Sequence, residues 1–238
     1  MTYTIELHYD EVNEKDHFLT LYRPVPATDT LPDWFKKLDN QVNGFRTAKS
    51  CRGLFDVMTM GYTIVWTFDV LINKDEHGKL FIKKARDGGG QDFSAHPHLQ
   101  MGMYPDAHLH QQQKGVEKVN LPYRVVTPRG TSVMLVQPPY RPDLKTEIMP
   151  GVIDSDKFYS PLNVLFTIKD IPVGKEIRIS AGTPLAQLVP FVRTEWKLRF
   201  KKVDQKKFRV MQSNMDNLDK YYQKFLWTRK IFKKDTEN

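Results

Sequence analysis

The sequence contains only one cysteine, Cys51, among 238 residues, so no disulfide can form within the chain. This scarcity favours a protein made and kept in a reducing, cytoplasmic setting. No apolar run approaches the roughly 18 residues that cross a bilayer, so we expect no membrane insertion. The first residues lack both a basic segment and a long apolar segment, so we also expect no signal peptide.

Net charge is missing from most of the chain. Residues 1–192 carry 22 basic and 22 acidic side chains, whereas residues 193–238 carry 14 basic and 6 acidic ones and so account for the whole charge of +8. We therefore predict a basic C-terminal appendage at 196–238. It would bind nucleic acid or an acidic partner through 197–234, or simply present a solvated helix face.

Short segments rich in β-branched and aromatic residues recur between turns marked by proline and glycine, which is typical of a compact all-β barrel or sandwich. We predict strands over 2–9, 62–72, 80–82, 123–127, 132–137, 146–149, 162–168, 176–179 and 184–191. Short helices are expected at 33–38 and near 50–59. Residues 1–195 would form one β-rich domain.

The C-terminus follows a helical period. Ser213 or Asn214 can cap a helix. The apolar residues that follow it have the spacing of one helix face: Leu218, Tyr221, Tyr222, Phe225 and Leu226. We expect an amphipathic helix here, docked either on its own domain or on a partner.

Three segments carry a family resemblance. Thr127 to Ser132 forms a Thr-Pro-Arg-Gly-Thr-Ser turn, Gly151 to Asp156 reads Gly-Val-Ile-Asp-Ser-Asp, and Gly182 to Leu188 reads Gly-Thr-Pro-Leu-Ala-Gln-Leu. In order and spacing, residues 127–191 resemble the core of the dUTPase and dCTP-deaminase family. The resemblance implies a β-clip fold with its core at about 120–195, and a homo-oligomer, with a trimer favoured.

The resemblance also implies a ligand site. In that family the aspartate at the Asp154 position contacts the deoxyribose hydroxyl and orients the attacking water, as a carboxylate general base would. The implied ligand-binding residues are Asp154, Asp156, Tyr159, Arg141 and Gln187, with Mg²⁺ as the metal of a hydrolase. The sequence departs from the pattern at three places: Lys157 replaces the usual tyrosine, Arg141 is displaced from the phosphate-binding motif, and the glycine-rich C-terminal arm is absent. A structural alternative is that Asp154 and Asp156 accept hydrogen bonds from backbone N–H groups in a tight turn.

A broader resemblance spans most of the chain. Pro32 to Lys37, the glycine–tyrosine strand at Gly61 and the segments above are similar to a family of tailed-phage proteins that includes cyanophage proteins. No activity comes with this likeness. It implies synthesis in a host cytoplasm, with the virion as a further location.

Four histidines form two His-x-His pairs: His96 with His98, and His108 with His110. On a strand such pairs place both rings on one face, where they can bind a divalent metal. The pattern begins like a cupin motif, but the glutamate and the last histidine of that motif are missing. A polar loop or a subunit contact is the alternative.

Three functions follow. The first is a non-enzymatic phage β-clip protein, associated with the virion or binding a partner. The second is a nucleotide-binding protein or divergent Mg²⁺-dependent nucleotide hydrolase built on Asp154. The third is a cupin-like metal-binding protein.

Overall fold

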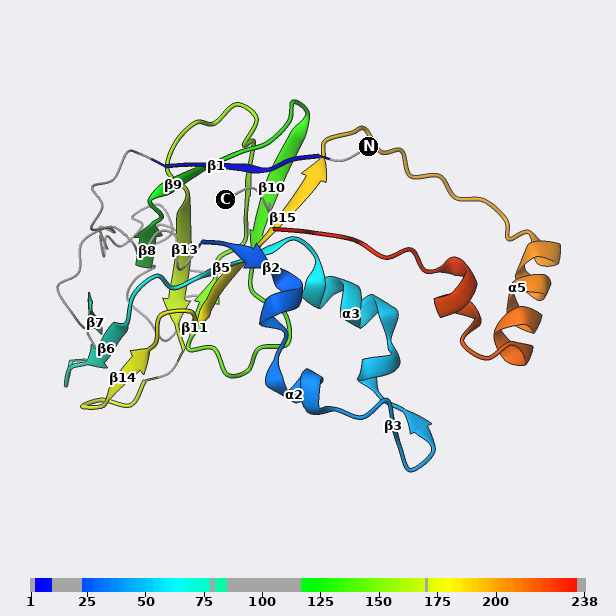
Figure 1. Ribbon diagram of the computed structural model, residues 1–238, viewed down its shortest axis with the longest axis horizontal. Coiled ribbons are helices and arrows are strands. Elements are labelled where there is room, and N and C mark those ends of the chain that lie inside the picture. The colour runs from blue at the N-terminus through cyan, green and yellow to red at the C-terminus, as the bar shows by residue number, and fades with distance from the viewer. Residues whose placement is uncertain (1–2, 10–22, 78–79, 85–116, 170, 235–238) are drawn as a thin grey trace.

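The computed structural model describes residues 3–9, 23–77, 80–84, 117–169 and 171–234. The protein is mostly β (Figure 1). In the described part of the chain the strands form separate sheets and not one closed barrel. The predicted mostly-β class with a C-terminal helix is therefore confirmed.

The largest sheet is antiparallel and has five strands in the order β12-β10-β15-β5-β2. Their bounds are Gly151–Ile153, Thr131–Val136, Pro184–Val192, Tyr62–Val65 and Val25–Pro26. β15 is nearly all apolar, and its residues 184–189 are buried, because it lies in the middle of the sheet. Register pairs Ser132 of β10 with Phe191 of β15. This register brings the start of β10 beside the end of β15.

The remaining strands form smaller antiparallel sheets. One has the order β11-β13-β8, with bounds Thr146–Ile148, Asn163–Ile168 and Glu117–Asn120. A second has the order β14-β6-β7, with bounds Glu176–Ile179, Val70–Lys74 and Leu80–Lys84. Two-stranded pairs join β1 (Glu6–Tyr9) to β9 (Tyr123–Val126), and β3 (Gln41–Val42) to β4 (Phe45–Arg46).

The core lies where these sheets face one another. Trp66 and Phe166 are its largest fully buried side chains, and their rings meet edge to face with centroids 5.6 Å apart. Ile64, Val133 and Leu185 from the five-stranded sheet join the same cluster. Edge-to-face packing is the favoured arrangement of aromatic rings.

Two short helices lie beside the sheet, at the places predicted. α2 spans Asp33–Lys37 and α3 spans Arg52–Thr59; the 3₁₀ turns η1 (Ala27–Thr30) and η2 (Ala48–Ser50) precede them. The predicted strand at 62–72 is interrupted: β5 ends at Val65, and β6 begins at Val70 in a different sheet. The segment Gly151–Asp156, predicted as a turn, begins with a strand, β12.

The predicted C-terminal helix is wrong in its position. The helix α5 spans Gln205–Asn217, and Asp204 caps it by accepting a hydrogen bond from the Lys207 N–H at 3.1 Å. Ser213 and Asn214 lie inside this helix. Beyond α5 the predicted helix does not continue, since Lys220 has a left-handed φ of 57°, and a π-helical turn, η4 (Tyr222–Leu226), follows. No helix in the described ranges is long and apolar enough to cross a membrane.

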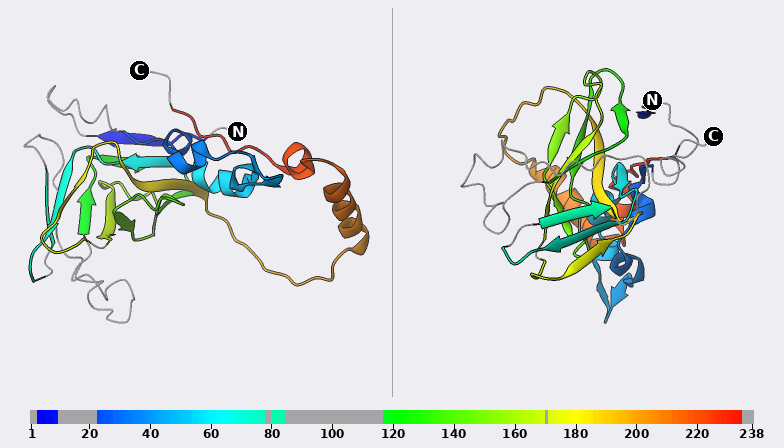
Figure 2. Two further views of the ribbon diagram at one scale, coloured as in Figure 1. Left: turned by 90° about the horizontal axis from the view of Figure 1, so that it is seen from below. Right: turned by 90° about the vertical axis from the view of Figure 1, so that its left-hand side faces the viewer.

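α5 stands away from the sheets, at the end of an extended segment that leaves β15 (Figures 1 and 2). The chain then returns to its own core. The Trp227 indole N–H donates to the Asp56 carboxylate of α3 at 2.9 Å, and Lys230 forms an ion pair with it at 2.7 Å. Further on, the Phe232 ring meets Tyr62 edge to face, and the Tyr62 hydroxyl donates to the Lys233 carbonyl at 3.1 Å.

Gly61 is a position where the fold requires glycine. Its φ is +78°, and an added Cβ would lie 2.0 Å from the Leu188 carbonyl oxygen. Gly44 provides a matched control: it forms an Asn-Gly hairpin turn with a φ of +79°, and no atom lies within 4 Å of its added Cβ.

We predict that Gly61→Ala destabilises the protein by about 4 kcal/mol or more, because backbone atoms of β15 must shift. Gly44→Ala suffers only the left-handed backbone penalty of about 1–2 kcal/mol. Urea unfolding of both variants measures the difference. Equal losses of stability would show that the close approach of Gly61 to β15 does not constrain the fold.

Candidate functional site

The candidate site is the turn that follows β12. The N–H groups of Lys157 and Phe158 both donate to the Asp154 carbonyl oxygen at 2.9 Å, which closes a tight turn over 154–158. The short side chains of Asp154, Ser155 and Asp156 suit such a turn. The turn therefore presents its carboxylates at a fixed place beside the start of β10.

Asp154 is held by two partners from distant parts of the chain. Its Oδ1 accepts a hydrogen bond from the Ser132 hydroxyl at 2.7 Å and lies 2.9 Å from the Arg193 Nη1. The Asp154 side chain is 54% exposed, so its other oxygen faces solvent.

Asp156 is more deeply buried than Asp154. Its side chain is only 2% exposed, and its Oδ2 forms an ion pair with Arg193 Nη2 and accepts a hydrogen bond from the Gly130 N–H at 2.9 Å. Arg193 also donates to the Ser132 hydroxyl at 3.0 Å. One guanidinium group thus bridges both carboxylates and the start of β10.

A second set of hydrogen bonds links the same turn to residues 127–131. The Thr127 and Ser155 hydroxyls lie 2.7 Å apart, and the Thr127 hydroxyl donates to the Thr131 carbonyl at 3.0 Å. The Arg193 N–H donates to the Gly130 carbonyl at 2.8 Å. The 127–132 turn and the 151–156 turn, which carry the family resemblance, are therefore in direct contact.

The electrostatics follow from these bonds. Hydrogen bonds from Ser132 and then Arg193 lower the pKa of Asp154 below its ordinary value. The Arg193 hydrogen bond and the Gly130 N–H lower the pKa of Asp156 to about 2. Both carboxylates, in turn, raise the pKa of Arg193. Both aspartates are therefore ionised at neutral pH, and a carboxylate with so low a pKa is a weak general base.

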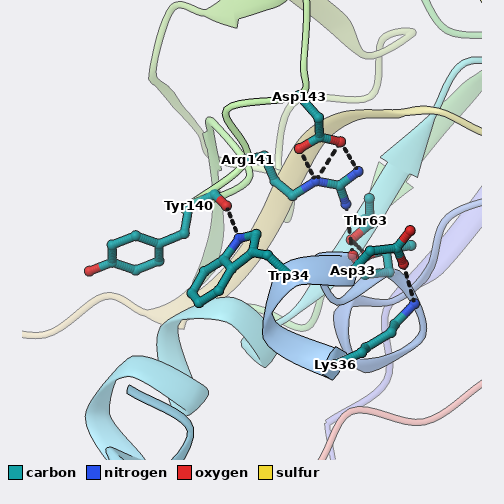
Figure 3. Close-up of polar contacts among 8 residues, drawn as sticks. Asp33, Trp34, Lys36, Thr63, Tyr140, Arg141 and Asp143 are labelled. Carbon is teal, nitrogen blue, oxygen red and sulfur yellow. Dashed lines mark hydrogen bonds and ion pairs between the residues drawn. The ribbon is translucent and has the colours of Figure 1, made fainter. Parts of the chain in front are cut away.

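Arg141 does not join this site. Its guanidinium binds Asp143 in bidentate fashion, with Nη2 2.7 Å from Oδ2, and Nη1 donates to the Thr30 carbonyl at 2.9 Å (Figure 3). The Trp34 indole N–H donates to the Tyr140 carbonyl at 2.9 Å beside it. Arg141 thus ties the 140–143 loop to η1.

Gln187 is fully buried, and its amide donates to the Val57 carbonyl at 3.0 Å and the Met60 carbonyl at 2.5 Å. It anchors α3 on β15.

Tyr159 turns towards the β1–β9 pair. Its hydroxyl lies 3.1 Å from His8 Nδ1, the Arg124 guanidinium lies 5.4 Å from its ring centroid, and His8 Nε2 lies 2.7 Å from Glu6 Oε2. Of the five predicted ligand residues, only Asp154 and Asp156 share an ion-pair partner.

A pocket of about 310 Å³ lies beside β12, with Gly151 and Ile153 of that strand in its lining. Ile153 and Phe158 border it beside the turn, and Lys118, Ser160 and Asn163 are the polar residues of its lining. The rest of the lining is apolar: Val125, Leu135, Met149, Pro150, Gly151, Pro161, Leu162 and Leu165. Neither aspartate lines this pocket.

The predicted metal sites have two outcomes. His96, His98, His108 and His110 lie outside the described residues, so the cupin-like site stays a prediction. At the aspartate turn, Asp154 Oδ1 and Asp156 Oδ2 both pair with the Arg193 guanidinium, which would compete with Mg²⁺ for these two oxygens. Within the described ranges no group of three or more His, Cys, Asp or Glu side chains is placed to bind a metal.

Comparison with known proteins gives distant structural likenesses. No family model matches the chain, and no curated protein matches its sequence. A dUTPase from phage phi11 of S. aureus is 14% identical with a TM-score of 0.33, covering 71% of this chain and 93% of that one. The dUTPase of Staphylococcus bacteriophage 80alpha is 13% identical with a TM-score of 0.38, covering 86% and 98%. A second structure of that dUTPase, with dUpNHpp, is 15% identical with a TM-score of 0.31, covering 71% and 85%. Likeness at this level does not assign an activity.

Arg193 is the site residue that sequence reasoning missed. It lies one residue beyond β15, inside the predicted domain 1–195, and enters the sequence analysis only as one of the 14 basic residues of 193–238. Its partners Ser132 and Asp156 are 61 and 37 residues away. No local spacing signals such contacts. The available signal was the pair of aspartates itself, because a nearby cation favours the ionised form of two adjacent carboxyl groups.

The aspartate pKa values predict an acid-dependent stability difference. The folded pKa of Asp156 lies below its unfolded value of about 3.9, so its stabilisation is present above about pH 4 and is lost as pH falls towards 2. We expect Arg193→Met to be less stable than the wild type at pH 7, and the gap to narrow between pH 4 and 2. Denaturant titrations across that range measure it. The exposed Arg199→Met is the control, and a gap independent of pH would contradict the assignment.

Proposed function

We propose that the chain is a non-enzymatic, phage-type β protein that functions as a homo-oligomer and binds a partner, in the virion or during its assembly. The observation that supports this best is the Arg193 bridge. It commits both candidate carboxylates to structure and lowers their pKa values, which opposes a role as general base.

Two further observations support a binding role. Arg141, the residue nearest to a phosphate-binding arginine in the sequence, is engaged by Asp143 and Thr30. The basic C-terminal residues, proposed to form a separate appendage at 196–238, expose large apolar side chains, including Trp196 and Phe200. Exposed apolar surface of this kind marks interaction sites. The phage setting rests on the sequence resemblance over Pro32–Lys37 and the segments that follow it.

Nucleotide binding without hydrolysis is the second candidate. The pocket beside β12 favours it, because the pocket combines an aromatic ring, Phe158, with the amide of Asn163 in an apolar lining. Small-molecule sites commonly have this composition. The ligand would enter beside the aspartate turn without using its carboxylates as a base.

The test is a titration of dUTP, dCTP and dTTP, each with Mg²⁺, by calorimetry, together with an assay for phosphate release. We expect neither micromolar binding nor hydrolysis. Nucleotide binding that Phe158→Ala weakens about tenfold or more would favour the second candidate.

Hydrolysis that Asp154→Asn abolishes, and that the exposed control Asp33→Asn retains, would overturn the non-enzymatic proposal. Both variants keep the side-chain shape, and both wild-type side chains are more than half exposed. Circular dichroism of each variant confirms that it is folded.

A further inference from the structure

A groove lies between residues 3–7, at the start of β1, and the C-terminal segment 231–234. It has two adjoining compartments of about 740 and 330 Å³, and Tyr62 and Lys233 line both of them. In Figure 1, β1 crosses β10 and β15, and the C-terminal segment, drawn in red, ends beside these strands. Both volumes are in the range of small-molecule sites. We call this cavity the β1 groove.

The floor of the β1 groove is one face of the five-stranded sheet. Thr131 of β10 pairs with Val192 of β15, and Leu188 of β15 pairs with Tyr62 of β5. Paired residues of antiparallel strands project to the same face, and so do alternate residues of one strand. Pro190, between Leu188 and Val192, therefore shares this face, and all five residues line the groove. The floor is mostly apolar.

Thr131 places a polar group on this apolar floor. The residue is only 5% exposed, and its Oγ1 has no hydrogen-bond partner in the described part of the chain. The register places its side chain on the face that Pro190 and Val192 share in the groove. A buried hydroxyl without a partner destabilises the fold, and a ligand that brings an acceptor removes that cost.

Cations border the same groove. Arg23, Lys233 and Lys234 line it, and Glu6 is the only acidic residue among the described residues of its lining. Lys234 lies 3.7 Å from a carboxylate oxygen of Asp29. Within the ranges that the structure describes, the Arg23 and Lys233 side chains form no ion pair. A cleft lined by charges of one sign attracts a ligand of the opposite sign, so the groove favours an anion.

Tyr62 fixes the C-terminal wall of the groove. Its hydroxyl donates to the Lys233 carbonyl at 3.1 Å, and its ring meets the Phe232 ring edge to face, with centroids 5.9 Å apart. Burial raises the pKa of Tyr62, so the hydroxyl remains a neutral donor at pH 7. These contacts hold the backbone of Lys233 in place and leave its ammonium group available to a ligand.

We propose that the β1 groove binds a small amphipathic anion, which carries one acidic group on an apolar body. The acidic group pairs with Lys233 and accepts a hydrogen bond from the Thr131 hydroxyl, while the apolar body lies on Tyr62, Pro190 and Phe232. A free small molecule suits the groove better than a bilayer does, because chain segments wall it on two sides. The site is separate from the aspartate turn and does not depend on the proposed function.

The first test is calorimetry of the full chain with three probes that share one alkyl chain: decanoate, decanol and decylammonium. We expect decanoate to saturate one site with a Kd of about 100 µM or tighter, in keeping with the affinity that small ligands reach per atom. Decanol should bind at least about tenfold more weakly, because it lacks the charge that Lys233 attracts, and decylammonium should not bind.

The second test uses variants of the groove. Thr131→Val should weaken decanoate binding about tenfold, the effect of a lost hydrogen bond to a charged group. The same variant should be at least as stable as the wild type in urea, because the hydroxyl has no partner in the fold. Lys233→Met should also weaken binding about tenfold. The exposed Lys202→Met, and Phe158→Ala in the pocket beside β12, are the controls and should bind decanoate normally.

Four binding results would overturn the inference: no saturable binding of decanoate, equal binding of decanoate and decanol, binding that neither groove variant weakens, or binding to phosphatidylglycerol vesicles without binding of free decanoate. A loss of stability in Thr131→Val would also overturn it, because the hydroxyl would then be bonded within the fold. A monomer that binds decanoate would overturn the proposed homo-oligomer and leave this site standing, whereas an oligomer that ignores decanoate would do the reverse.

Discussion

Arg193 is the residue on which the arrangement of the candidate site depends. Two carboxylates two residues apart in one turn repel each other, and this repulsion opposes the hydrogen bonds from Ser132 and Arg193 that lower the pKa of Asp154. The guanidinium offsets part of this repulsion and also contacts the Ser132 hydroxyl. Three segments that are distant in sequence are thereby joined: the start of β10, the turn after β12 and the end of β15.

The same bridge determines what chemistry the turn can perform. A general base requires a carboxylate whose pKa lies near the working pH and whose oxygens are free to hold water. Asp156 meets neither condition, because it is buried and paired, and Asp154 keeps only one oxygen facing solvent. The contacts with Arg193 that fix the two aspartates in place also lower their pKa values, so the same contacts make them weaker bases.

The sequence predicted elements where local pattern and tertiary packing agree. β10, β13 and β15 are rich in apolar residues, and they lie in the core. β12 was missed because three residues, one of them glycine, cannot show a strand period. α5 was missed because its sequence is mostly polar and is defined by the Asp204 cap, while the apolar row after Leu218 suggested a helix that Lys220 interrupts. The site could be predicted only as two aspartates, since Arg193 reaches them through tertiary structure.

Arg193 also lies where the chain leaves the five-stranded sheet, one residue beyond β15. Its backbone N–H donates to the Gly130 carbonyl, and its guanidinium contacts Ser132, Asp154 and Asp156. These contacts fix the direction in which the following residues depart. Since the same guanidinium fixes the turn after β12, a displacement of Arg193 would move that turn and the start of the C-terminal segment together.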